Sequence, residues 1–125
     1  MRILVGMLPL VVALALLPAC KSSLQLYTTR SADMREDNAP RLNVFASGEK
    51  PAIVVDLPTG CGWGEKTGTV WVEEATSRRT VWSQRQFMQE GYTHFFVPEG
   101  LKRGTYAVTL RSEGEAKASI HFEVE

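Results

Sequence analysis

The residue best suited to chemistry in this chain is Cys61, which lies in a glycine-rich stretch together with Trp63. A thiol there can react, can pair with a cysteine of another chain, or can lie buried as a small apolar group, and the buried state is the one we expect. A catalytic thiol needs a base, and neither histidine lies near Cys61 in the sequence. Because glycines flank Trp63, its ring either projects as a binding tip or folds back over an open end of the domain. We take this loop as the leading candidate binding site.

Two further tryptophans, Trp71 and Trp82, lie on runs that are expected to form a hairpin, residues 69–75 and 80–86. A two- or four-residue turn places both indoles on one face as diagonal neighbours, whereas a three-residue turn splits them between faces. The sequence does not decide which face is buried, because both faces carry polar and apolar residues. The two rings are therefore either core residues, the interpretation we favour, or an exposed aromatic platform for a sugar or a protein.

The other reactive side chains show no spacing typical of a catalytic or metal site. His94 and His121 each alternate with apolar neighbours, and no metal-ligand motif contains either of them. Glu73 and Glu74 are adjacent on an expected strand, so they point to opposite faces and cannot act as a carboxylate pair. With neither a phosphate loop nor a nucleophile motif, we predict no enzymatic activity, no cofactor and no metal site. The 14 basic and 14 acidic residues balance, which argues against a nucleic-acid partner.

The elements that must position these residues are short strands, and no helix is expected. From residue 42 onward, apolar runs rich in β-branched and aromatic residues alternate with turn signals, a pattern typical of a sandwich or barrel. In the last two runs one face is apolar and the other polar, as in antiparallel sheets, and Glu113 and Gly114 are expected to join them as a hairpin. The expected strands are residues 42–46, 52–57, 69–75, 80–88, 92–97, 105–112 and 116–124.

One segment near the C-terminal end, residues 101–108 (LKRGTYAV), resembles the late-strand region of immunoglobulin-like and fibronectin-type-III-like domains. There a leucine, a turn glycine and a tyrosine precede an alternating strand, and here these are Leu101, Gly104 and Tyr106. The resemblance implies that the Tyr106 hydroxyl bonds back to the upstream backbone as a tyrosine corner. It also implies the fold class, an all-β, immunoglobulin-like antiparallel sandwich of about seven strands. The Cys–Trp–Cys pattern of antibody domains is absent from the sequence.

The first 19 residues have the character of a secretory signal, with Arg2, an apolar run to Leu17 and a small residue before Cys20. A transmembrane span needs about 20 apolar residues. This run is shorter and contains Pro9, which disfavours a continuous helix. We therefore expect residues 1–19 to be a cleaved signal peptide.

Residues 17–20 (LPAC) resemble the lipobox of bacterial lipoproteins, with Pro18 as a departure from the family pattern. The resemblance implies cleavage before Cys20 and acylation of its sulfur and amine, and several acyl chains anchor a protein firmly to a membrane. The residue after the cysteine is Lys21 rather than aspartate, which in this family implies delivery to the outer membrane. The alternative for Cys20 is a disulfide with Cys61.

The mature chain is then expected to have two parts. Residues 20–41 form a lipidated N-terminus and tether, in which residues 24–29 either add a first strand to the sandwich or extend the tether. Residues 30–41 are polar and charged, so they lack the apolar groups that would order them. Residues 42–125 form the β-sandwich domain.

These expectations together suggest a non-enzymatic outer-membrane lipoprotein that faces the periplasm. It would act as a binding or assembly subunit of a larger envelope complex of the secretion, pilus or motor type, with an envelope protein as its partner. Edge strands and the loop of Cys61 and Trp63 are the expected contacts. The alternative is a ligand-binding module, either for a glycan or for the inhibition of a hydrolase.

Overall fold

The computed structural model describes residues 23–31, 40–98 and 101–125. This part of the chain forms eight strands and no α-helix, so the predicted all-β class is confirmed. None of its segments is a helix long and apolar enough to cross a membrane. The predicted signal peptide, Cys20 and residues 32–39 of the predicted tether lie outside the described residues. The strands are β1 (Gln25–Arg30), β2 (Val44–Phe45), β3 (Pro51–Leu57), β4 (Lys66–Glu74), β5 (Thr80–Met88), β6 (Gly91–Phe96), β7 (Gly104–Ser112) and β8 (Glu115–Val124).

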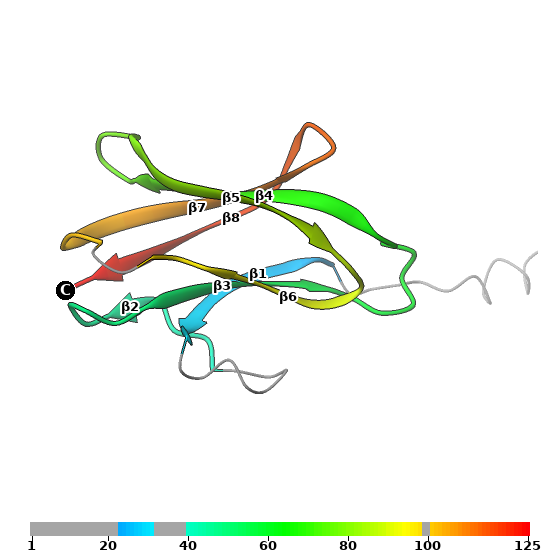
Figure 1. The fold of residues 1–125 in the computed structure, drawn as a ribbon, viewed down its shortest axis with the longest axis horizontal. Helices are drawn as coiled ribbons and strands as arrows, with labels where there is room; N and C mark the ends of the chain where they lie inside the picture. The colour runs from blue at the N-terminus through cyan, green and yellow to red at the C-terminus, as the bar shows by residue number, and fades with distance from the viewer. Residues whose placement is uncertain (1–22, 32–39, 99–100) are drawn as a thin grey trace, which may run out of the picture.

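The strands form two sheets that pack face to face as two layers (Figure 1). One sheet has the order β1-β3-β6 and the other the order β2-β8-β7-β4-β5. All neighbouring pairs are antiparallel except β2 and β8, which run parallel. The result is the predicted β-sandwich. Each of the seven expected runs overlaps one of its strands, and β1 adds another.

The first strand is an integral part of the sandwich rather than a length of tether. β1 pairs with β3 along its whole length, from Gln25 opposite Asp56 to Arg30 opposite Pro51. Its alternation buries Leu26 against the core between the sheets. The folded body therefore begins upstream of residue 42, and residues 24–29 belong to it.

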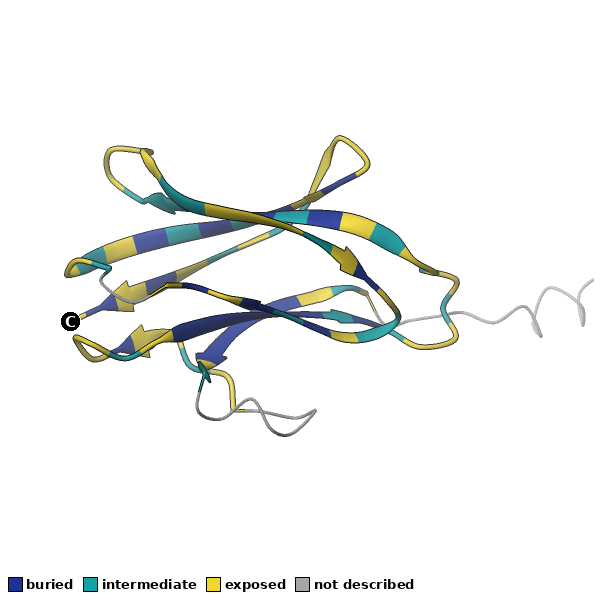
Figure 2. Cartoon of the chain, in the orientation of Figure 1, coloured by how far each residue is buried: buried dark blue, intermediate teal, exposed yellow. Residues whose placement is uncertain are grey.

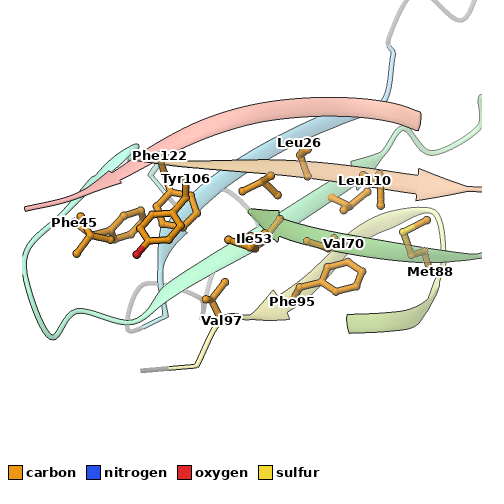
Figure 3. Packing of buried hydrophobic residues seen from close by; sticks show 14 of the residues in the cluster. Leu26, Phe45, Ile53, Val70, Met88, Phe95, Val97, Tyr106, Leu110 and Phe122 are labelled. Atoms are coloured by element: carbon orange, nitrogen blue, oxygen red, sulfur yellow. The ribbon is translucent and has the colours of Figure 1, made fainter. Parts of the chain in front are cut away.

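The core lies between the two sheets, toward which β4, β6 and β7 turn every second residue (Figure 2). On β7 the predicted inner face is confirmed, since Tyr106, Val108 and Leu110 are all buried. Glu113 and Gly114 join β7 to β8 as the predicted hairpin, and both adopt positive φ, 56° and 79°. That conformation matches a two-residue turn between twisted strands. The buried cluster shown in Figure 3 contains Leu26, Phe45, Ile53, Val55, Leu57, Val70, Val72, Met88, Phe95, Val97, Tyr106, Val108, Leu110, Phe122 and Val124.

The tyrosine corner implied by the family resemblance is present. The hydroxyl of Tyr106 donates a hydrogen bond to the backbone carbonyl of Lys102. The Tyr106 ring stacks on Phe122 with centroids 5.3 Å apart, and Phe45 meets Phe122 edge-on at 5.6 Å. Burial, together with the nearby Glu74 carboxylate, raises the pKa of the Tyr106 hydroxyl.

Candidate functional site

The glycine-rich loop of residues 58–65 joins β3 to β4 and is held by a carboxylate from a distant turn. The backbone N–H groups of Gly60 and Gly64 donate to the two carboxylate oxygens of Glu90, at 3.0 and 2.9 Å. Gly60 and Gly64 have positive φ, 79° and 64°, which glycine adopts without strain. The hydrogen bond from Gly64, followed by that from Gly60, lowers the pKa of Glu90. Glu90 lies 30 and 26 residues away along the chain, and the sequence contains no local signal of this contact.

Cys61, in the middle of this loop, is half-buried and disulfide-bonded, and the described residues include no free cysteine. The expectation of a free, buried thiol is therefore wrong. The other cysteine of the chain, Cys20, lies outside the described residues. Gln25 lies five positions after Cys20 and pairs with Asp56, which lies five positions before Cys61. The register thus brings the start of β1 to the same end of the sandwich as the loop.

Trp63 is half-buried and packs against the hydrophobic core. The ammonium group of Lys66 lies 5.3 Å from the centroid of its ring, within range of a cation–π contact. Of the two alternatives for Trp63, this placement favours the ring folded back over the end of the sandwich and disfavours a projecting binding tip. A binding role for the loop would have to use the exposed glycines around the ring and the part of the ring that remains accessible.

Trp71 and Trp82 lie on opposite faces of the five-stranded sheet. Trp71 pairs with Ser83, whereas Val72 pairs with Trp82. Trp82 therefore shares the inner face with the buried Val72, and it packs half-buried against the core. Trp71 points outward and is 36% exposed. Of the two arrangements that the sequence left open, the structure has the one with the indoles on different faces.

The reason is a β-bulge next to the turn. The backbone N–H of Glu74 donates to the carbonyl of Arg79 at 2.9 Å, which closes a turn of four residues. The register then shifts by one between Val72 and Glu73, because Val81 is an extra residue on β5. A shift of one residue moves every following side chain to the other face. Trp82 is thereby turned inward while Trp71 stays outside.

The outer face around Trp71 is an open groove of about 490 Å³ that the sequence did not indicate. Thr69, next but one to Trp71 on β4, pairs with Arg85 on β5 and with Arg111 on β7. Paired residues share a face of the sheet, so both arginines lie on the face of Trp71, on either side of Thr69. The groove is lined by Thr67, Thr69, Trp71, Arg85, Arg111, Ser112, Glu113 and Gly114.

The charge of this groove is positive. Arg85 and Arg111 are exposed, and neither forms an ion pair with any described residue. Glu113 at the rim is paired with the ammonium of Lys66 at 3.1 Å, and this hydrogen bond lowers the pKa of Glu113. A groove that combines an aromatic ring with two guanidinium groups can bind carboxylates, other anions or the face of a sugar ring.

The two histidines lie apart. His94 is half-buried on β6 of the three-stranded sheet, and His121 is exposed on β8 of the five-stranded sheet. Across the described ranges, no three histidine, cysteine, aspartate or glutamate residues gather where they could hold a metal ion. Glu74 accepts hydrogen bonds from Ser77 and Arg79 within its own turn, and these lower its pKa.

Comparison with known proteins gives no family for this chain. No protein-family model matches it, and no curated protein matches it.

Proposed function

We propose that this chain is the precursor of a non-enzymatic outer-membrane lipoprotein whose sandwich acts as a binding or assembly subunit of a larger envelope complex. The observation that carries the binding role is the exposed Trp71 in one groove with Arg85 and Arg111. Tryptophan and arginine are the residues most enriched at the energetic centres of protein interfaces. Because a paired strand already fixes their backbone, little entropy is lost there on binding. The two guanidinium groups favour a protein partner that presents carboxylates.

The anchor is proposed to be acyl chains on Cys20, and its support is the lipobox-like sequence of residues 17–20. A sulfur that carries a lipid cannot also form a disulfide with Cys61, so the two fates of Cys20 exclude one another, and in the acylated chain the disulfide of Cys61 must join it to a cysteine of another chain. The intact mass of the chain extracted from membranes distinguishes them. A mass raised by acyl chains supports the anchor, whereas an unacylated chain with a disulfide overturns it.

The partner is tested by native mass spectrometry of the chain purified gently from detergent-solubilised envelopes. A stoichiometric partner is expected with the unaltered chain and should be lost from Trp71→Ala and Arg111→Glu. Arg103→Glu is the matched control, because Arg103 is exposed, lies outside the groove and undergoes the same charge change. A partner that stays bound to Trp71→Ala and Arg111→Glu would show that the groove is not the contact.

A glycan ligand is the second candidate, and the threonines beside the tryptophan favour it. Thr67 and Thr69 line the groove with Trp71, so hydroxyl groups stand next to an exposed ring face. Sugars bind in this way, by stacking on the ring and hydrogen bonding at its edge. Titration with envelope oligosaccharides should change the tryptophan fluorescence of the unaltered chain but not that of Trp71→Ala. A response that persists in Trp71→Ala would refute this candidate.

A further inference from the structure

The free edges of the two sheets differ in how they are protected against pairing with another strand. At β1, the backbone N–H of Leu42 donates to the carbonyl of Thr28 at 2.8 Å, and the Thr28 hydroxyl donates to the carbonyl of Leu42. That edge is thus covered by the chain itself. At the edge of the other sheet, β2 is only two residues long. Both are ordinary ways of blunting an edge.

The edges formed by β5 and β6 lie on the other side of the sandwich and contrast with each other. β5 is interrupted by the bulge at Val81 and carries the exposed charge of Arg85. Bulges and charges both discourage strand addition. β6, with the sequence GYTHFF, contains no aspartate, glutamate, lysine or arginine, and its register with β3 is regular throughout. β6 is therefore the least protected edge in the described part of the chain.

The backbone groups that β6 offers can be assigned from its register. The N–H of Val97 donates to the carbonyl of Pro51 at 3.1 Å. In an antiparallel pair the hydrogen-bonded positions recur at every second residue, so Val97 and every second residue before it bond to β3. Tyr92, His94 and Phe96 therefore direct their N–H and C=O groups away from β3. No described strand lies on that side of them.

The side chains of the same residues are unusually apolar for an exposed edge. Phe96 is 56% exposed, Tyr92 is 39% exposed, and Phe87 at the end of β5 is 53% exposed. Together with His94 they line an open groove of about 390 Å³ beside β6. We call these four residues the aromatic edge. Exposed aromatics that flank free backbone groups mark a surface for pairing rather than for solvent.

We propose that β6 pairs antiparallel with β6 of a second copy of this chain, about a twofold axis at His94. This register places Tyr92 opposite Phe96 of the second copy and His94 opposite His94, so that aromatic residues face each other across the strands. Three residue pairs that each exchange two bonds give about six backbone hydrogen bonds. A strand without charge meets itself without repulsion, and one twofold contact closes the assembly at two copies. The inference does not rest on the proposed function, because β6 and the Trp71 groove belong to different sheets.

Charge exchange at the axis tests this pairing in the full-length chain. Two differently tagged copies are expected to co-purify from detergent-solubilised membranes. His94→Lys alone and His94→Glu alone should each reduce co-purification about tenfold or more, because like charges then face each other directly. Co-expression of His94→Lys with His94→Glu should restore it. Single variants that pair as well as the unaltered chain, or a mixture that fails to recover while each variant melts normally, would overturn the proposal.

Cross-linking gives an independent measurement. Residues in a hydrogen-bonded antiparallel pair have Cα atoms about 5.5 Å apart, within the range of about 4.4–6.8 Å that a disulfide spans. His94→Cys should therefore form an oxidised dimer in membranes. Val44→Cys, 37% exposed on β2, is the control with the same native cysteines. Equal amounts of dimer from the two cysteine variants would show that the edge does not pair with itself. The same conclusion would follow if His94→Lys or His94→Glu lost a different protein rather than the second copy.

Discussion

Removal of one hydroxyl group, by Tyr106→Phe, isolates what the tyrosine corner contributes to stability. The ring remains and keeps its stacking on Phe122 at 5.3 Å, so only the bond to the Lys102 carbonyl is lost. Such a bond contributes about 0.5–1.5 kcal/mol, and a carbonyl left without a partner adds to the loss unless water reaches it. Because Lys102 is exposed, water can reach that carbonyl, and we expect the free energy of unfolding to fall by about 1 kcal/mol. The melting temperature should then fall by about 4–8 °C.

Urea denaturation followed by circular dichroism measures this change, with Tyr92→Phe as the matched control because its hydroxyl is on an exposed residue. The pKa of Tyr106 is raised by burial, so its contribution is full below its ordinary pKa of 10.0 and is lost as the pH rises through the folded pKa. As the pH rises above about 10, the free energy of unfolding should therefore fall less for Tyr106→Phe than for the unaltered chain. If Tyr106→Phe is as stable as the unaltered chain at neutral pH, the corner does not stabilise this fold.

Four further substitutions test the core, the loop and the two tryptophans. Gly68→Ala should lower the free energy of unfolding by about 1 kcal/mol, because its Cβ would lie 2.5 Å from the Cε atom of the buried Met88, whose flexible end must move; an unchanged urea midpoint would contradict this packing. Glu90→Gln should make the free energy of unfolding less sensitive to acid. Because the pKa of Glu90 is lowered in the folded chain, its stabilisation is present above pH 4.5 and is lost as the pH falls through the folded pKa. The unfolding curves of the two proteins should therefore differ at neutral pH and converge in acid. Trp82→Ala should cost about 2–3 kcal/mol and Trp71→Ala less than about 1 kcal/mol, and equal losses in thermal melts would contradict their placement on opposite faces.

The strands could be predicted because the signals for them are local. The run at residues 80–88 coincides with β5, and the hairpin at Glu113 and Gly114 follows from two residues that favour a tight turn. Alternation along β7 also fixed its inner face correctly. Burial periodicity and turn chemistry act over a few residues, so a single sequence displays them.

The site could not be predicted to the same degree, because its contacts depend on register and on distant strands. The bulge at Val81 has no distinctive sequence, yet it alone decides that Trp82 is turned inward. The Trp71 groove takes Arg85 and Arg111 from two different strands, and only the pairing of both with Thr69 brings them together. The sequence raised these tryptophans as candidates but could not say which of them would be exposed.

The short distance between Cys20 and β1 limits where a partner can stand. Five residues span at most about 18 Å when fully extended, and β1 begins at Gln25, beside the loop of residues 58–65. The Glu113 and Gly114 turn, at the rim of the Trp71 groove, lies at this same end of the sandwich, as its ion pair with Lys66 at the start of β4 requires. If Cys20 is anchored in a bilayer as proposed, the groove can open only toward a layer a few nanometres deep above the lipid. A partner must therefore bring its own acidic surface down to the membrane, and the domain would select among proteins by their height above the bilayer as well as by their chemistry.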